Sequence, residues 1–455
     1  MRLRTREIYC PAHFGNSYEV MGRREMREYL AETVFWGFTR YGDWFDTIDL
    51  SDPYAEPRHY QFAHSLWDRK RAAFQAAQQA GLETSLIITP NHVFVDQVTS
   101  ANQARQDRPD VFGQLVCPSQ PGVRAMIAGN YTNLFRDLAA CGVSLTAIAP
   151  CPYDYGGCTC EACQPWIVTF AELAGELLSI ARRYHPEVEL HTVGWWWKPE
   201  EHQQFAAYAD RALPGEVRSI ALHIPYGERQ PPVVNMPAGS AVRAFIHNGY
   251  ADAAEPRDVY GKWGPVAAPR RLPETLANLA ERGADGFMAY SEGIYEDVNR
   301  AILGALSSGQ ASDVASVLGE YARRYFGASE AGSSEWAAWL QAWGEPWQAD
   351  LVAQRALFDR LAATAPPSWR LEQWACKLRL FELHQQIGEG TTWPASRLAA
   401  ASEWLDTMEH LQRRVWGVGP LRHIFGEKFM MPAWYESYRQ TAGLPGSTAQ
   451  VLAEM

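Results

Sequence analysis

Residues 144–163, SLTAIAPCPYDYGGCTCEAC, contain the pattern that decides the fold. A short apolar run, Ser144–Ala149, is followed by a loop with two glycines, and an amphipathic segment, Trp166–Tyr184, follows the loop. A strand, a loop and a helix in this order form one βα unit. Glycines let such a loop bend sharply, so the loop can hold a side chain at the strand end, facing a cleft.

The same alternation recurs along the chain up to about residue 310. Strands are predicted at Glu7–Pro11, Thr33–Thr39, Thr84–Thr89, Ser144–Ala149, Glu189–Gly194, Ser219–His223, Ala241–His247 and Gly286–Tyr290. Helical patterns lie between them, at Arg58–Ala80, Val123–Ala140, Trp166–Tyr184, Pro199–Ala212, Pro273–Glu281 and Tyr295–Ser307. Eight strands interleaved with helices predict an α/β fold, a (β/α)8 TIM barrel, over residues 1–310.

A doubly wound open sheet is the competing fold. Such a sheet normally has a glycine-rich phosphate loop after its first strand, whereas here Pro11-Ala12-His13-Phe14-Gly15 stands at that point. Beyond residue 311 the chain is rich in Ala, Leu, Arg and Trp and has no strand-like alternation. We therefore predict a mainly α-helical C-terminal domain over residues 311–455.

Composition restricts the classes of partner. The net charge is -11 and no basic stripe is visible, which argues against nucleic acid as a partner. The chain contains no run of about 18 apolar residues, so no membrane span is predicted. Its N-terminus lacks the apolar core of a secretory signal. We therefore expect a cytoplasmic protein, for which a homo-oligomer is compatible with the acidic, aromatic-rich chain. The 18 Trp and 20 Tyr offer flat faces that stack on sugar rings.

In a (β/α)8 barrel, reactive groups lie at the carboxyl ends of strands. Asp154 follows the fourth predicted strand, and Glu292 follows the eighth in a turn of small residues. Two such carboxyl groups are what glycosidic cleavage requires, one to protonate the leaving oxygen and one to stabilise the sugar cation or activate water. We predict Asp154 and Glu292 as this catalytic pair. A helix-terminal role suits the neighbouring Glu296 and Asp297 better.

Polar and aromatic residues follow the other strands, and a barrel brings such strand ends together around one cleft. The predicted substrate-binding residues are His13, Asn91, His92, Trp195, Trp197, His223, Tyr226 and Asn248. Alternate residues of a strand point to opposite sides, so Trp195, Trp196 and Trp197 do not all face one way.

Four cysteines predict a metal site. Cys158, Cys160 and Cys163 lie in the glycine-containing loop, and Cys117 follows the third strand on the same rim of the barrel. Four thiolates form a closed tetrahedral zinc site, which would be structural. Cys151 is the rival fourth ligand, and reduced thiols without metal are the alternative. We expect no organic cofactor.

Three segments carry a family resemblance: LVCPS at residues 115–119, DYGGCTCEAC at residues 154–163, and Ser291-Glu292-Gly293. On these segments the chain resembles bacterial glycoside hydrolase barrels of the α-glucuronidase and β-hexosaminidase-like superfamily. Residues 321–327, YARRYFG, look like the helical segment that follows the barrel in those proteins. The resemblance implies a barrel enzyme that hydrolyses a carbohydrate.

The cysteine pattern is similar to the zinc cluster of a β-galactosidase family with the same barrel, and this likeness favours Cys117 over Cys151. Those β-galactosidases carry an Asn-Glu pair where this chain has Tyr153-Asp154. The sequence thus predicts a glycosidase that removes a terminal sugar. A carbohydrate-binding barrel without catalysis and a zinc-dependent hydrolase remain as alternatives.

Overall fold

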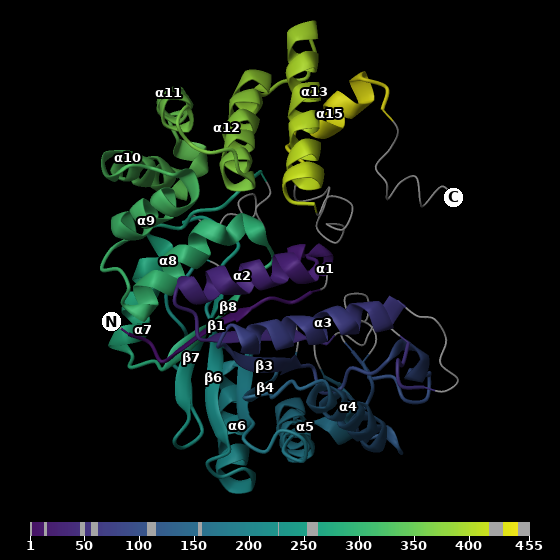
Figure 1. The fold of residues 1–455 in the computed structure, drawn as a ribbon. Coiled ribbons are helices and arrows are strands. Elements are labelled where there is room, and N and C mark those ends of the chain that lie inside the picture. The colour runs from purple at the N-terminus through teal and green to yellow at the C-terminus, as the bar shows by residue number, and fades with distance from the viewer. Residues whose placement is uncertain are drawn as a thin grey trace. The chain divides into compact units, whose positions relative to one another are not determined.

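Eight parallel strands close into one barrel in the chain order β1 to β8 (Figure 1). The computed structural model describes residues 2–12, 16–45, 51–55, 62–106, 115–152, 157–225, 227–252, 263–417 and 431–444. The strands are β1 (Thr5–Tyr9), β2 (Arg40–Trp44), β3 (Glu83–Ile88), β4 (Ala147–Pro150), β5 (Glu189–Gly194), β6 (Val217–His223), β7 (Ala241–His247) and β8 (Gly286–Tyr290).

The barrel closes through the pairing of its first and last strands. β1 lies parallel to β8, with Thr5 opposite Gly286 and Tyr9 opposite Tyr290. Every other strand pairs in parallel with the next strand along the chain. This closed order confirms the predicted (β/α)8 barrel and excludes the doubly wound open sheet, whose strand order reverses at a switch point.

Helices follow every strand except β6, after which the described residues up to β7 form no helix. They are α1 (Ser17–Val20), α2 (Arg23–Phe35), α3 (Phe62–Gln79), α4 (Val123–Ala140), α5 (Trp166–Ala181), α6 (Pro199–Ala212), α7 (Arg271–Glu281) and α8 (Asp297–Ser308), with short 3₁₀ turns at Val95–Gln97, Glu161–Cys163 and Ile294–Glu296.

The predicted second strand was wrong. Thr33–Thr39 was predicted as a strand because it is rich in β-branched and aromatic residues. In the structure, its first three residues end helix α2, where the Thr33 hydroxyl donates to the Tyr29 carbonyl 2.8 Å away. Gly37 then adopts a positive φ of 91°, which ends the helix, and β2 begins three residues later. Tertiary context thus overrode the local strand propensity.

Beyond the barrel strands, the described residues from Val314 to Thr441 form helices and no strand. They are α9 (Val314–Phe326), α10 (Glu330–Gln341), α11 (Leu351–Ala362), α12 (Trp369–Ile387), α13 (Ala395–His410), the π-helical turn Leu411–Val415 and α15 (Tyr435–Thr441), with short 3₁₀ turns at Ala342–Gly344 and Pro346–Gln348. Side-chain caps begin several of them, as where Asp313 accepts from the Ser316 amide at 2.8 Å. A buried tryptophan cluster forms their core, in which Trp339 contacts Trp336, Trp343 and Trp374. The mainly α-helical C-terminal region is therefore confirmed.

A buried ion cluster holds the first turn of α8. Asp297, which is 3% exposed, accepts from Arg300, Arg370 and the Tyr321 hydroxyl. Burial alone would raise the pKa of the Asp297 carboxyl, but the charges of Arg370 and Arg300 outweigh it and lower the pKa to about 2. Asp297 is thus a paired internal anion that links α8 to α9 and α12.

Contacts within the chain group the protein into two compact units. The first comprises residues 1–12, 21–247 and 275–291, and the second comprises residues 13–20, 248–274 and 292–455. This grouping puts α8 with the C-terminal helices. The boundary after residue 310 stays a prediction.

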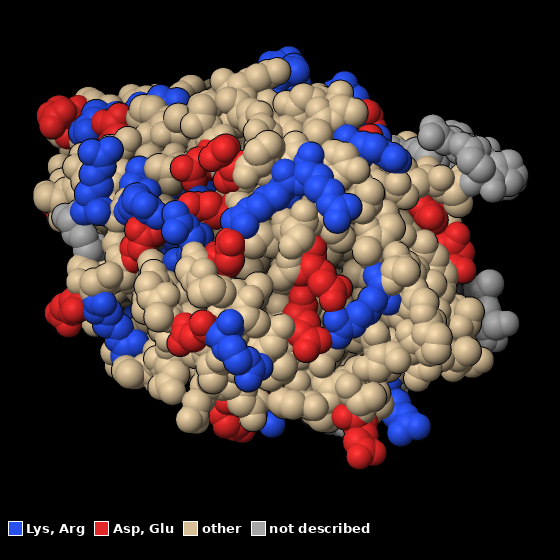
Figure 2. All heavy atoms as spheres, turned by 90° about the horizontal axis from the view of Figure 1, so that it is seen from below, with Lys and Arg blue, Asp and Glu red and all other residues tan. Residues whose placement is uncertain are grey.

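The surface carries charges of both signs. Figure 2 shows Lys and Arg side chains beside Asp and Glu side chains on the face that it draws. One surface ion pair joins Arg124 to Glu172 at 2.6 Å. The absence of a nucleic-acid partner stays a prediction. Among the described helices, none has the length and apolar character needed to cross a membrane.

Candidate functional site

The carboxyl end of the barrel carries a continuous group of aromatic and imidazole rings in the first unit. We call this group the aromatic wall, and its members are Tyr9, Trp195, Trp196, His223, Phe245, His247 and Tyr290. Four of them are the last residues of their strands, β1, β6, β7 and β8. Two more begin the loop after β5. The barrel itself therefore positions the wall, because its strands end at one rim.

The rings of the wall contact one another in sequence around the rim. The Trp195 ring centroid lies 4.2 Å from that of His223 and 5.0 Å from that of His247. The His247 centroid lies 5.8 Å from that of Tyr290, which lies 5.6 Å from that of Tyr9. These separations are those of tilted and edge-on ring pairs, which fix each ring against its neighbours.

The imidazole of His223 is uncharged at neutral pH. Burial lowers the pKa of His223 to about 4, because the buried charged form loses its hydration. A neutral imidazole offers one N–H donor and one acceptor nitrogen. Beside flat aromatic faces, this combination suits a ligand with both hydroxyl groups and apolar C–H faces.

Glu292 lies in the second unit, in the turn after β8, and its backbone is fixed on both sides. Its amide donates to Glu296 Oε1 at 2.7 Å, and its carbonyl accepts from the Ser17 amide at 3.0 Å. The Tyr295 hydroxyl donates to Glu292 Oε2 at 3.1 Å, and the side chain is partly exposed. A hydroxyl donor of this kind stabilises the carboxylate form and orients it.

Glu296 positions this turn. It precedes α8, but its side chain does not cap the helix. Instead it accepts from the Glu292 amide and, at 3.0 Å, from Asn248 Nδ2. A Cβ at Gly249 would lie 2.9 Å from Glu296 Oε1, so the carboxylate occupies the space beside this glycine. The side-chain amide nitrogen of the predicted binding residue Asn248 therefore already donates a hydrogen bond within the second unit, to Glu296.

Asn91 and His92 follow β3 and are buried. Asn91 Nδ2 donates to the carbonyls of Val116, at 3.1 Å, and Gly157, at 3.5 Å, so it joins the loops after β3 and β4. The His92 ring contacts that of Trp44 at 5.8 Å, and burial lowers its pKa to about 3. The role of Asn91 and His92 in binding stays a prediction.

Trp197 points to a different neighbourhood from Trp195. Its ring contacts Phe170 on α5 at 5.7 Å, and His202 and Phe205 on α6, each at 4.9 Å. The structure therefore brings Trp195 and His223 together and sets Trp197 among the helices, in accord with the expectation that the three tryptophans diverge. The predicted residues His13, Asp154 and Tyr226 lie outside the described residues.

Four cysteines come together where the loops after β3 and β4 meet. We call Cys117, Cys158, Cys160 and Cys163 the cysteine cluster; their sulfur atoms all lie within 4.8 Å of one another. Cys117 Sγ is 3.6 Å from both Cys160 Sγ and Cys163 Sγ. Cys151, the rival ligand, is buried near Thr89 and is not a member.

The cluster fits a tetrahedral zinc ion. Zn–S bonds of about 2.3 Å place neighbouring sulfurs about 3.8 Å apart, close to the observed separations and far longer than a disulfide of about 2.05 Å. Burial acts to raise the pKa of Cys160, but hydrogen bonds from Cys158 and Cys163 outweigh it and lower the pKa to about 7. A hollow of about 540 Å³, lined in part by Gln103, Arg105 and Glu161, opens beside the cluster.

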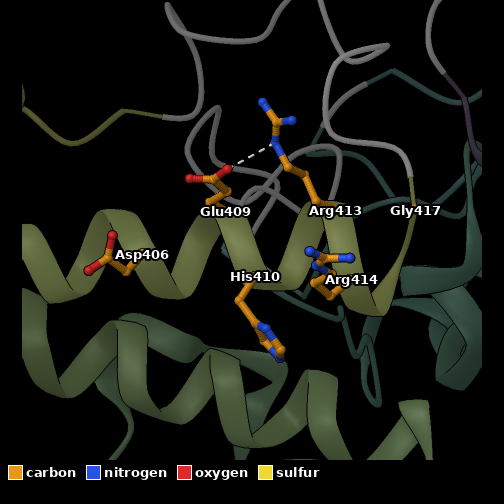
Figure 3. A pocket seen from close by; sticks show the side chains of 6 residues that line it. All are labelled: Asp406, Glu409, His410, Arg413, Arg414 and Gly417. Carbon is orange, nitrogen blue, oxygen red and sulfur yellow. Dashed lines mark ion pairs between the residues drawn. The ribbon is translucent and has the colours of Figure 1, made fainter.

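A second hollow, of about 590 Å³, lies on α13 and the π-helical turn, far along the chain from these residues. Figure 3 shows its lining side chains, which are Asp406, Glu409, His410, Arg413 and Arg414, beside Gly417. Arg413 pairs with Glu409 at 3.2 Å, and His410 Nε2 lies 2.7 Å from Glu372 Oε1. Its charges are exposed and mixed in sign, so it shows no preference for one ligand charge.

Sequence reasoning missed Tyr9, His247, Tyr290 and the positioning role of Glu296. The first three are the final residues of strands, and two of those strands were predicted with correct ends. Except for His223, the predicted site residues all lay beyond the predicted strand ends, so these three were not among them. A signal was present, because the terminal residue of a barrel strand still faces the rim.

No family model and no curated protein matches the chain. Among solved structures, it is similar to the catalytic domain of a β-amylase from Paenibacillus polymyxa, with 9% identity over 68% of this chain and 98% of that one, at a TM-score of 0.43. It is also similar to a GH138 enzyme targeting pectin rhamnogalacturonan II, with 8% identity over 94% and 59% of the two chains and a TM-score of 0.44. A third similar structure is that of CpGH84B, with 11% identity over 92% of this chain and 76% of that one, at a TM-score of 0.43.

Proposed function

We propose that the protein is a glycoside hydrolase that removes a terminal sugar, with Asp154 and Glu292 as its two catalytic carboxyl groups. The observation that carries the proposal is the aromatic wall, which offers stacking faces and the neutral imidazole of His223 at the rim where barrel enzymes bind their substrates. Both acids follow strands of this barrel, β4 and β8.

The surroundings of Glu292 support a catalytic role. Its backbone is held by Glu296 and Ser17, and its carboxylate accepts a hydrogen bond from Tyr295 while remaining partly exposed. In the proposed reaction, one carboxyl protonates the leaving oxygen and the other attacks the sugar or activates water. Glu296 acts through the Glu292 backbone and is a positioning residue.

The proposal is tested by turnover of a panel of aryl glycosides, including uronides, with the wild type and two variants. Glu292→Gln removes one proposed carboxyl, and Glu330→Gln, at a side chain that is 92% exposed, is the matched control. We expect the wild type and Glu330→Gln to hydrolyse the same glycoside and Glu292→Gln to lose at least about 100-fold in kcat. Equal turnover by all three proteins would move catalysis away from Glu292.

Two other functions give different outcomes in the same assay. A carbohydrate-binding barrel without catalysis would bind a glycoside that it does not cleave, and Glu292→Gln would weaken binding without changing turnover. In a zinc-dependent hydrolase, chelation would abolish turnover at once and reversibly. The all-thiolate composition of the cysteine cluster disfavours this last function, because catalytic zinc usually keeps His or carboxylate ligands and a water.

We further propose that the cysteine cluster holds a structural zinc ion, which would join the loops after β3 and β4. Support comes from the sulfur separations and from Asn91, whose amide already joins the same loops. Metal analysis of the purified chain should give about one zinc per protein. Cys117→Ser should lose it and lower Tm, whereas Cys376→Ser, at a buried cysteine of α12, should keep it. Equal metal content in both variants would refute the site.

A further inference from the structure

Trp196 is exposed to an unusual degree. It is the most exposed of the tryptophans that the structure describes, with 53% of its surface open to solvent. A large apolar side chain of this kind gains free energy when another surface covers it. Its neighbours in the loop, Trp195 and Trp197, are each partly buried against other rings.

The backbone of Trp196 is strained. Its φ is 59°, and among the described residues no other residue except glycine has a positive φ. The left-handed conformation brings Cβ close to the following carbonyl and is disfavoured for a bulky residue, so glycine would suit this position better. Strain that the fold retains at a rim loop is a mark of a functional position.

The strained conformation sets the ring at one end of the aromatic wall. The loop between β5 and α6 is only four residues long, and the Lys198 amide anchors its far end by donating to Glu201 at 2.7 Å. The Trp196 ring centroid lies 4.9 Å from that of His223 and 5.5 Å from that of Trp195, which it meets edge-on. The ring is therefore fixed on one side and open on the other.

This arrangement suits one chemical class of ligand. An indole face packs against the C–H face of a sugar ring, and the adjacent imidazole can exchange hydrogen bonds with the sugar's hydroxyl groups. The rings that contact Trp196 are those of Trp195 and His223, and burial keeps the His223 imidazole uncharged, so neither of them offers a charge to pair with a carboxylate. A neutral sugar therefore matches the wall better than a uronic acid, which would bring an unpaired carboxylate beside apolar rings.

We propose that Trp196 is a stacking platform for a neutral sugar ring of the substrate, held in place by Trp195 and His223. This inference rests on the proposed function, from which it takes a carbohydrate as the substrate. It adds that Trp196 contacts this substrate and that the contacted sugar ring is uncharged.

The test measures binding rather than turnover. Wild-type protein is titrated with neutral phenyl glucosides, galactosides, mannosides and N-acetylglucosaminides of both anomers, and with phenyl glucuronide, by isothermal calorimetry. The same titrations are made with Trp196→Gly, Trp196→Phe and Phe35→Ala, the last removing an exposed aromatic ring of α2 that is 37% exposed. Thermal unfolding is recorded for every protein.

We expect at least one neutral glycoside to bind, Trp196→Gly to weaken it about tenfold, and Trp196→Phe and Phe35→Ala to stay within about threefold of the wild type. Tm of Trp196→Gly should equal or exceed that of the wild type, because glycine relieves the strain. A large fall in Tm would make Trp196 a structural support and overturn the proposal. Unchanged binding by Trp196→Gly, preference for the glucuronide, or no neutral glycoside bound would overturn it too.

This outcome is separable from that of the proposed function. Binding that depends on Trp196, without hydrolysis of any glycoside, would uphold the platform and refute the glycosidase. Hydrolysis that Trp196→Gly leaves unchanged in KM would uphold the glycosidase and refute the platform.

Discussion

His202 makes the stability of the barrel sensitive to acid. It lies on α6, is 1% exposed, and its ring packs 4.9 Å from that of Trp197. In the part of the chain that the structure describes, its Nδ1 has no hydrogen-bond partner. Burial lowers the pKa of His202 to about 4, because a charged imidazole would lose its hydration among these rings.

The sign and size of the effect follow from linkage. Between about pH 6.5 and 4 the unfolded chain binds a proton at this histidine and the folded chain does not, so acid favours unfolding. At pH 5 the pH lies about 1.5 units below the ordinary pKa of histidine, so nearly all unfolded chains carry the proton. The corresponding loss in the free energy of unfolding is about 2 kcal/mol. The loss begins near pH 6.5 and levels off below about pH 4. Its size at pH 5 depends little on the folded pKa, provided that this pKa stays near 4.

His202→Leu removes the titrating group and fills the same apolar space. Because Nδ1 is unpaired in the described structure, an apolar replacement should cost little at pH 7. Urea unfolding at pH 7 and pH 5 should show that the variant loses about 2 kcal/mol less between the two values than the wild type. Phe205→Leu, at a neighbouring buried residue of α6 that carries no titrating group, is the control and should lose as much as the wild type. An equal loss by His202→Leu and the wild type would refute the assignment.

Other variants test the packing. A Cβ at Gly286 would overlap the carbonyl oxygen of Thr5 where β8 meets β1, so Gly286→Ala should lower the free energy of unfolding by at least about 2 kcal/mol. Gly129→Ala, in α4 with open space around the new Cβ, should instead raise it by about 0.5–1 kcal/mol; the same sign for both would contradict the reasoning. Asp297→Asn should cost about 3–5 kcal/mol because it leaves buried arginines uncompensated, whereas Glu335→Gln, on an exposed ion pair that water screens, should leave the free energy of unfolding almost unchanged. Thermal and urea unfolding measure each change.

Much of the barrel was predictable because each unit has a clear local signal. The strands Glu189–Gly194, Ala241–His247 and Gly286–Tyr290 and the helices Val123–Ala140 and Pro199–Ala212 have the predicted bounds. In each case an apolar run or an amphipathic period ends at Gly, Pro or a polar loop, so local pattern and tertiary demand agree. At Thr33–Thr39 the two disagree, and the tertiary context decided.

The site was less predictable, because it depends on which side chains the barrel brings together. Cys117 lies about 40 residues from the other cysteines in the chain. The pattern put it on the same rim but left Cys151 as a rival, and only the family resemblance favoured Cys117. The role of Glu296 could not be predicted, because its partners, Asn248 and the Glu292 amide, are set by the turn geometry and not by a spacing rule. The aromatic wall could be predicted only if the strand ends were known to within one residue, because four of its members are the last residues of their strands.

The division into two interleaved units has a practical consequence for making parts of this protein. Three segments of each unit alternate along the chain, so the polypeptide passes between units at five junctions, and no single cut yields either unit whole. A fragment ending at residue 310 would separate the almost wholly buried α8 from α9 and would deprive Asp297 of Tyr321 and Arg370. Such a fragment would expose apolar surface and leave Asp297 with Arg300 as one of its two arginine partners, and it would aggregate on expression. Gene design should therefore keep the chain intact and place affinity tags or fusion partners at its ends.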